Sequence, residues 1–336
     1  MSHDPNRPVG PPIEPVPSGV AQPRWSVMIP TYNCARTLTS TIDSVLVQAP
    51  GPEEMEIVVV DDASSDDVEA VVARHRERVA LHRQPKNLGV PANLTACIRL
   101  ARGEIVHILH GDDEVRPGFY DAMGRAMAHP DVGAAFCRQI FADATGARLG
   151  ISPLEQKTSG VIPDALVFLA SEQRVMTPSI CVRRSVYEML GGFHAELGCS
   201  EDWEMWVRIA AWFPIWYEPE PLAVYRMQAV SNTGRNQRTG RDLEFTARAI
   251  EIISGYLPAP ERADAARRSR ATYAKSALEV AESAAERGDF ETAVAQWKGA
   301  LRLSRSGGVI ARAVLSLVRI GGRSLRRAGA SRADLS

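Results

Sequence analysis

The sequence predicts an α/β protein in which an open, mostly parallel sheet is flanked by helices and followed by a helical appendage. From about Trp25 to Phe141, short β-branched runs alternate with amphipathic helical stretches, which is typical of a parallel sheet with helices on both faces. After Gly240 the pattern becomes helical, and RGDFETAVAQWKGALRL resembles one half of a helical-hairpin repeat without a second copy.

The first expected unit is the strand WSVMI, ended by Pro30, and a helix whose apolar residues follow the helical period. The second is the strand EIVVV, which stops at Asp61 and Asp62 before a helix with acids in its first turn. VALHR predicts a third, more exposed strand. The helix after it has Pro91 in its first turn and ends at Gly103.

The fourth expected strand, EIVHIL, runs into His110, Gly111, Asp112 and Asp113. Acidic residues therefore follow two strands, at the edge where open α/β sheets bind ligands. Residues 133–226 mix strand-like and helical runs, so this middle segment is expected to extend the sheet and to close over the site.

Three segments are expected along the 336 residues. Residues 1–23 are rich in proline and poor in large apolar side chains, which predicts a flexible leader. Residues 24–240 should form the α/β domain, and residues 241–336 a helical appendage with a basic tail. From Leu301 onward the sequence contains eight arginines and a single acid, Asp334.

Composition indicates a soluble, folded chain, because 45% of the residues are hydrophobic and 24% are charged. The five cysteines are widely spaced and form no CxxC pair, which favours reduced thiols over a disulfide framework or a zinc site. The chain has no apolar run of membrane-spanning length and no apolar core of a signal peptide near its start. We therefore expect a cytoplasmic protein.

Asp112 and Asp113 are candidate metal ligands. Hard divalent cations prefer oxygen ligands, and the short Asp side chain can be held rigidly. Mg²⁺ or Mn²⁺ bound there would bridge a diphosphate and neutralise charge on a leaving group. The alternative is that these acids follow a strand only to cap the next helix, as many do.

Five segments in order resemble the successive motifs of family 2 glycosyltransferases: SVMIPTYN, EIVVVDDAS, NLGVPANLTACIRLARGE, ILHGDDEV and SEDWEMWVRIA. The resemblance covers roughly residues 25–226 and implies a GT-A fold, with a nucleotide-binding half and an acceptor-binding half. It also implies an inverting transferase that moves a sugar from a nucleotide-diphosphate donor to an acceptor hydroxyl. Bacterial cell-surface polysaccharide or glycoconjugate synthesis is an expected setting.

The resemblance implies a set of donor-binding residues. Pro30, Thr31 and Tyr32 would line the nucleoside pocket, where the Tyr32 ring can stack on a base, and Asp62 would hydrogen-bond that base. Alternatively, Tyr32 packs the loop and Asp62 caps a helix. Asn93 would lie where a helix start faces the donor, or it is an ordinary residue of a first helical turn.

The metal motif of the family is commonly Asp-x-Asp, whereas this chain has His110-Gly111-Asp112. The departure leaves the metal-binding acid at Asp112, with Asp113 beside it. His110 would bond a ribose hydroxyl or simply pack. Arg226 belongs to a late Tyr-Arg element and would meet the diphosphate or form a salt bridge.

Glu201-Asp202 resembles the Glu-Asp pair of the family, in which the second acid is the general base. Asp202 would take the acceptor proton as the hydroxyl attacks C1 opposite the leaving diphosphate, so that configuration inverts. The alternative is a helix start that carries acids, with Ser200 as its cap and Trp203 as plain core.

Two other classes stay open. A sugar-phosphate nucleotidyltransferase should have a glycine-rich basic loop after its first strand, where this chain reads PTYNCART. A non-catalytic nucleotide-sugar-binding protein is suggested by His110, whereas Asp112 and Asp202 argue against it.

The expected partners are a nucleotide-diphosphate sugar and a glycan, lipid-linked or small-molecule acceptor. The basic tail suggests peripheral membrane contact, or else a solvated helix that packs on the body. Nucleic acid is not expected, because no aromatic residues alternate with the arginines.

Overall fold

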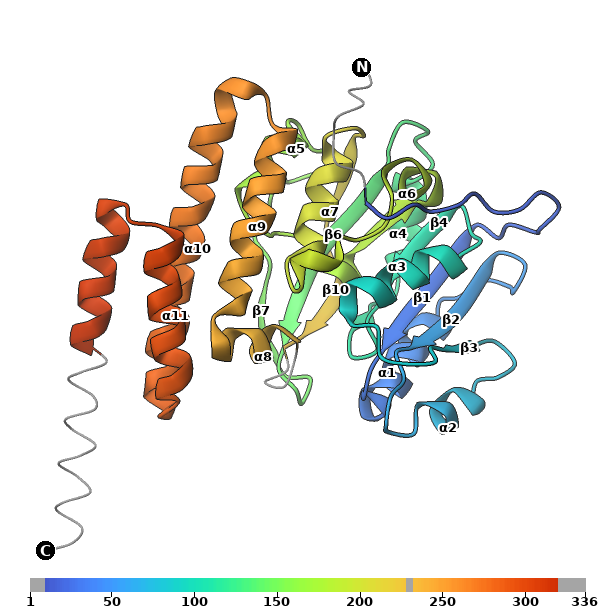
Figure 1. The fold of residues 1–336 in the computed structure, drawn as a ribbon. Helices are drawn as coiled ribbons and strands as arrows, with labels where there is room; N and C mark the ends of the chain where they lie inside the picture. The colour runs from blue at the N-terminus through green and yellow to red at the C-terminus, as the bar shows by residue number, and fades with distance from the viewer. Residues whose placement is uncertain (1–9, 228–231, 320–336) are drawn as a thin grey trace, which may run out of the picture. The chain divides into compact units, whose positions relative to one another are not determined.

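The computed structural model describes residues 10–227 and 232–319 (Figure 1). These residues divide into two compact units. Unit 1 takes residues 10–169, 173–196 and 201–227, and unit 2 takes residues 170–172, 197–200 and 232–319. The domain boundaries expected at residues 23 and 240 stay predictions.

Unit 1 is built on a mixed sheet with the strand order β3-β2-β1-β4-β9-β6-β10-β5, in which β7 pairs with β6 and β8 with β10. The strands are β1 (Trp25–Thr31), β2 (Met55–Asp61), β3 (Ala80–Arg83), β4 (Ile105–Ile108), β5 (Glu114–Val115), β6 (Ala134–Ala142), β7 (Arg148–Ile151), β8 (Gly160–Val161), β9 (Ile180–Arg183) and β10 (Ile215–Arg226). The four strands from β3 to β4 are all parallel, whereas β9 runs antiparallel to both β4 and β6. The predicted open α/β sheet is confirmed.

Helices cover both faces of the parallel strands. In unit 1 they are α1 (Ala35–Leu46), α2 (Val68–Ala73), α3 (Val90–Leu100), α4 (Phe119–Ala126), α6 (Arg184–Leu190) and α7 (Glu201–Ala210); α5 (Ala165–Ser171) extends into unit 2, and two short 3₁₀ turns are η1 (Thr177–Ser179) and η2 (Ala195–Leu197). Alternate residues of β1, Val27 and Ile29, share one apolar cluster with Leu38 and Ile42 of α1. Every residue of β1 is buried, as expected for a central strand with helices on both sides.

Residues 10–23 of the expected flexible leader belong to unit 1 and have no regular secondary structure. The Gly10 N–H donates to the Leu190 carbonyl at 2.9 Å, and the Gly192 N–H donates to the Pro11 carbonyl at 2.7 Å. Ile13 is buried. These contacts hold residues 10–13 on the α/β domain. The proline-rich composition of the segment does not reveal them.

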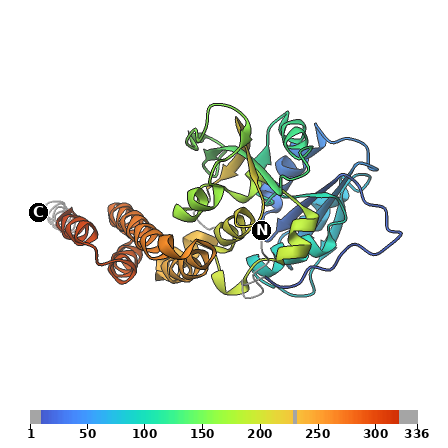
Figure 2. The same cartoon turned by 90° about the horizontal axis from the view of Figure 1, so that it is seen from above.

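Unit 2 is helical (Figure 2). It contains α8 (Asn232–Thr239), α9 (Arg241–Tyr256), α10 (Ala259–Arg287), α11 (Phe290–Leu303) and a helix over residues 307–319. A hairpin joins α10 to α11: Gly288 ends α10 with a positive φ of 84°, and Asp289 caps α11 by accepting the Thr292 N–H at 3.1 Å. Across the described residues, no helix has the length and apolarity that crossing a membrane requires.

Candidate active site

The loops after β1 and β2 are joined by hydrogen bonds. Asn33 adopts a positive φ of 52°, and its Oδ1 accepts the Ser65 N–H at 2.7 Å. The Asn33 N–H donates to Ser64 Oγ at 2.9 Å. This arrangement leaves the Tyr32 side chain 44% exposed beside the carboxyl end of β1. Tyr32 is therefore available to stack on a ligand.

Pro30 and Thr31, which were expected to line the same pocket, are buried. Thr31 Oγ1 donates to the Ile29 carbonyl at 3.1 Å. A Cβ on Gly111 would lie 2.9 Å from Thr31 Oγ1, so the loops after β1 and β4 approach each other as closely as only glycine allows. Pro30 and Thr31 thus support the loop that carries Tyr32.

Both acids after β2 are engaged inside the protein. Asp61 accepts a hydrogen bond from Arg83 Nη1 at 2.8 Å. Asp62 is 3% exposed, and its two oxygens accept the N–H groups of Leu88 at 2.7 Å and Gly89 at 3.0 Å. The pKa of Asp62 is raised, because the effect of burial exceeds the opposing effect of those two hydrogen bonds. A base N–H would have to use a remaining lone pair of the Asp62 carboxylate.

Asn93 is also buried, and both ends of its amide are bonded. Its Nδ2 donates to the Val60 carbonyl at 3.0 Å, and its Oδ1 accepts from Gln84 Nε2 at 3.3 Å. The side chain therefore ties α3 to the end of β2. This geometry offers no support for the expected donor contact.

The two acids after β4 lie in different surroundings. Asp113 is 1% exposed; its Oδ1 accepts the Arg226 N–H at 2.8 Å, and its Oδ2 lies 3.5 Å from His110 Nδ1. Asp112 is partly exposed. Its carbonyl accepts a bond from Arg226 Nε at 2.9 Å, and the Arg226 guanidinium also pairs with Glu114. Arg226 thus forms the salt bridge that was the alternative to a diphosphate contact.

His110 lies among carboxylates. Burial lowers the pKa of His110, but its hydrogen bond to Asp113 and the charges of Asp113, Asp112 and Asp202 outweigh burial and raise the pKa to about 9. The ring is therefore cationic at neutral pH. Its buried Nε2 has no hydrogen-bond partner among the described residues.

Asp202 stands in the first turn of α7. Its Oδ1 accepts the Trp203 N–H at 2.7 Å, and its Oδ2 accepts the Thr177 hydroxyl at 3.4 Å. Burial raises the pKa of Asp202 to about 6, while these hydrogen bonds and the nearby His110 lower it. Trp203 and Trp206 are buried and anchor the helix, so a core role for these tryptophans coexists with an acid placed in the site.

Glu201 and Tyr225 lie near the same carboxylates. Glu201 is buried, and its Oε2 has no hydrogen-bond partner among the described residues. Burial and the charge of Asp202 raise the pKa of Glu201 well above its usual range. Burial also raises the pKa of Tyr225, and the carboxylates of Asp113, Asp202, Asp112 and Glu201 raise it further. The Tyr225 hydroxyl thus belongs to the same site.

Sequence reasoning left Thr177 out and gave Tyr225 no role. The late Tyr-Arg element was a usable signal for Tyr225. No local pattern marks Thr177, because its contact with Asp202 spans 25 positions of the chain.

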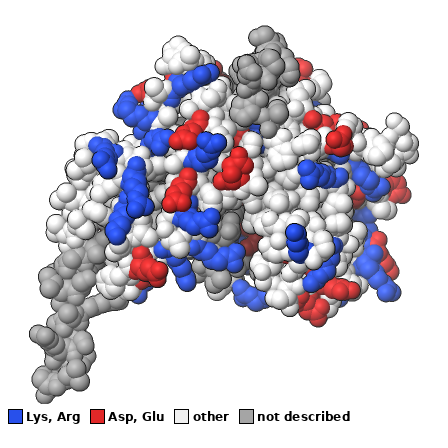
Figure 3. Space-filling view, viewed as in Figure 1, with Lys and Arg blue, Asp and Glu red and all other residues white. Residues whose placement is uncertain are grey.

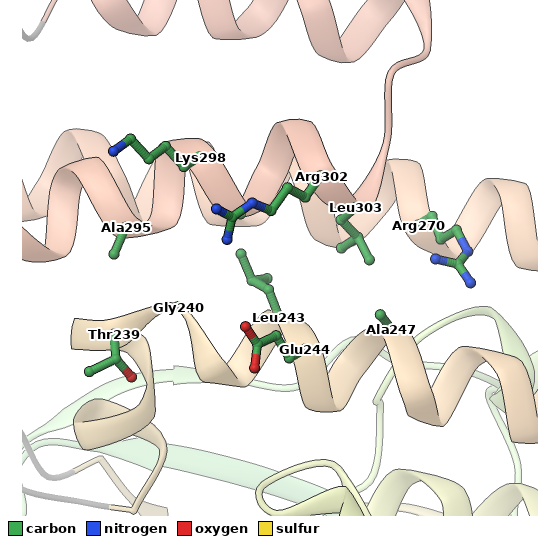
Figure 4. A pocket seen from close by; sticks show the side chains of 11 residues that line it. Thr239, Gly240, Leu243, Glu244, Ala247, Arg270, Ala295, Lys298, Arg302 and Leu303 are labelled. Carbon is green, nitrogen blue, oxygen red and sulfur yellow. The ribbon is translucent and has the colours of Figure 1, made fainter.

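Unit 2 contains a cavity of about 250 Å³ that none of these residues line. Its walls are formed by α9, α10 and α11, and its lining includes Leu243, Ala247, Arg270, Lys298 and Arg302. Figure 4 shows the Arg302 side chain extending toward Leu243 and Glu244 of α9. The acids that follow the strands and begin α7 define the candidate site, and this cavity does not.

Known proteins resemble this chain in sequence and in fold. The pattern of Glycosyl transferase family 2 matches residues 26–177, a segment that ends before Asp202. The uncharacterized protein MT1568 of Mycobacterium tuberculosis (strain CDC 1551 / Oshkosh) is 32% identical over 235 residues, which are 66% of this chain and 73% of the relative.

Two solved structures share the fold. S. aureus TarS 1–349 in complex with UDP-GlcNAc superposes with a TM-score of 0.58 at 15% identity, over 80% of this chain and 89% of TarS 1–349. The mannosyltransferase PcManGT from Pyrobaculum calidifontis, in complex with GDP-Man and Mn²⁺, gives 0.56 at 19% identity, over 95% and 91%. With this fold and these motifs, the chain is a transferase that belongs to glycosyltransferase family 2 and has the GT-A fold.

Proposed function

We propose that the transferase moves a sugar from a nucleotide-diphosphate donor to an acceptor hydroxyl, with inversion at C1 and with Asp202 as the general base. One observation carries this proposal: His110 and Asp112, in the loop after β4, lie near Asp202 of α7, so that both carboxylates act electrostatically on His110. Beside them, the buried atoms His110 Nε2 and Glu201 Oε2 have no hydrogen-bond partner in the described part of the chain. Unsatisfied polar atoms are costly unless a ligand pairs with them.

The proposed step needs one carboxylate. The acceptor oxygen forms a bond to C1 as the bond from C1 to the diphosphate oxygen breaks, and the acceptor proton passes to Asp202. The raised pKa of Asp202 brings this base closer to the working pH than an ordinary aspartate. Thr177 and the Trp203 N–H fix the direction of the carboxylate.

We further propose that Asp112 holds a divalent ion, Mn²⁺ or Mg²⁺. The described residues contain no group of three metal-binding side chains, but Mg²⁺ is commonly held by one or two carboxylates together with substrate phosphates. Asp112 is partly exposed and fits that description, whereas the enclosed Asp113 does not. When bound, the ion would neutralise charge on the leaving diphosphate. The Mn²⁺ in PcManGT supports this proposal.

The donor contacts proposed here are fewer than the sequence predicts. Tyr32 would stack on the base, and His110 would offer its Nε2–H to the ribose or the diphosphate. Asp62 would accept a hydrogen bond from the base only through a carboxylate lone pair that the Leu88 and Gly89 N–H groups do not use. UDP-GlcNAc in TarS and GDP-Man in PcManGT support a nucleotide-sugar donor for this chain.

The five cysteines are free, which supports a reducing, cytoplasmic setting. Residues 241–336 would form a separate appendage. A cell-surface polysaccharide or glycoconjugate acceptor stays a prediction. Neither the nucleotidyltransferase nor the non-catalytic reading is favoured by the comparisons.

Transfer can be tested directly. The purified chain is incubated with Mn²⁺, a panel of UDP- and GDP-sugars and simple glycan acceptors, and the anomeric configuration of the product is determined by proton NMR. We expect a product of inverted configuration from one nucleotide class. Retained configuration would exclude the single-base step. Pyrophosphate release from a nucleoside triphosphate and sugar phosphate would instead indicate a nucleotidyltransferase.

A further inference from the structure

The helix over residues 307–319 presents a continuous apolar surface. Between residues 309 and 318 every exposed side chain is apolar, and these residues are Ile310, Ala311, Val314, Leu315, Leu317 and Val318. Val318 is 69% exposed and Val314 is 56% exposed. At the helical period the six positions fall on one face, whereas single exposed apolar residues on protein surfaces are usually scattered. We call these six residues the apolar face.

The opposite side fixes the helix on unit 2, so the apolar face points outward. Val309 and Ala313 are buried in a core cluster with residues of α9, α10 and α11. Trp297 Nε1 donates to the Ala313 carbonyl at 3.1 Å, and Arg319 pairs with Glu282 of α10 at 3.0 Å. In Figure 3 the outer edge of this helix, at the left, is mostly the white of uncharged residues.

The charge of this end of the chain favours one class of partner for the apolar face. From Leu301 to the end of the sequence there are eight arginines and one acid, Asp334. A second copy would bring the same positive charge to the contact, so like-charge repulsion opposes self-pairing. Anionic lipid headgroups attract arginines, and the region just below them accepts apolar side chains of a helix lying in the membrane plane.

We propose that the apolar face of helix 307–319 inserts into the headgroup region of an anionic membrane, to which the net positive charge of residues 301–336 attracts it. The contact is peripheral, because the helix lies along the surface. It goes beyond sugar transfer and does not depend on the active-site assignment, since none of the apolar face belongs to that site.

The test is sedimentation of the full chain with vesicles of phosphatidylcholine and phosphatidylglycerol. Val314→Glu places a charge in the apolar face. Val294→Glu is the matched control, since Val294 is a valine of α11 with a similar exposure of 50% that lies outside this face. The wild type and Val294→Glu should sediment with the vesicles. The vesicle affinity of Val314→Glu should fall at least ~10-fold, because the valine that would enter the membrane is lost and the new negative charge is repelled by the anionic lipid.

Vesicles of phosphatidylcholine alone should bind the wild type more weakly, and added salt should reduce binding to the anionic vesicles. Thermal melting checks that both variants fold, which is expected because both side chains are exposed. Failure of the wild type to sediment with anionic vesicles would overturn the proposal, as would equal losses in the two variants. A dimer in light scattering that Val314→Glu makes monomeric would assign the face to a second copy instead.

Discussion

Acidic residues follow β2 and β4 and begin α7, but the two regions differ in how completely their buried polar atoms are hydrogen-bonded. Asp61 and Asp62 are engaged by Arg83 and by two backbone N–H groups. Around β4 and α7, by contrast, the buried atoms His110 Nε2 and Glu201 Oε2 have no hydrogen-bond partner among the described residues. Leaving buried polar atoms unpaired costs free energy, which is tolerated where a ligand completes them. This contrast indicates a structural role for the first region and supports the proposal that the second region carries the chemistry.

The largest expected effect separates the two regions by activity. Asp202→Asn should lower kcat about 10²- to 10⁴-fold with an unchanged Kd for the donor, because an amide cannot take the acceptor proton. The matched control is Asp131→Asn, a change at an exposed aspartate of unit 1. Steady-state kinetics and calorimetric donor titration measure the two quantities. Wild-type turnover by Asp202→Asn would show that Asp202 is not the general base.

The second effect separates them by stability. Asp62→Ala leaves the N–H groups of Leu88 and Gly89 without their acceptor, so the free energy of unfolding should fall by about 2–4 kcal/mol. Asp112→Ala should cost clearly less, because Asp112 is partly exposed. Urea denaturation compares the two variants. Equal losses of unfolding free energy would mean that Asp112 stabilises the fold as much as Asp62 does.

The smallest effect is a pH dependence. Asp202 must be ionised to act as a base, and burial raises its pKa to about 6, so kcat should rise as the pH increases through that value and then level off. Thr177→Val removes a hydrogen bond that favours the ionised form and should move the rise to higher pH, while Thr177→Ser should restore it. A kcat that is flat across this range in all three proteins would contradict the assignment.

The sequence was sufficient to predict the parallel strands, the helices between them and the acids at the strand ends, because each depends on a local pattern. The exposed third strand and the Pro91 helix are confirmed for the same reason. Family motifs supplied the order of these pieces and the expectation that Asp202 is the base, which stays a prediction.

What could not be predicted is which acids are engaged inside the protein. Asp62 binds amides 26 and 27 positions away, and Asp113 binds an amide 113 positions away. Such contacts leave no local signal in the sequence. Ile13 shows the same limit, because a single apolar residue in a proline-rich segment does not reveal that it is buried against the domain.

The most direct test of the central claim is metal-dependent donor binding by the wild type and Asp112→Ala. A ligand that binds the folded state raises the melting temperature by mass action. Thermal melting with UDP- and GDP-sugars should therefore show an increase that requires Mn²⁺ in the wild type and is lost in Asp112→Ala, while Asp131→Asn keeps it. A shift of the same size in Asp112→Ala would contradict the account, because the donor and its metal would then bind elsewhere.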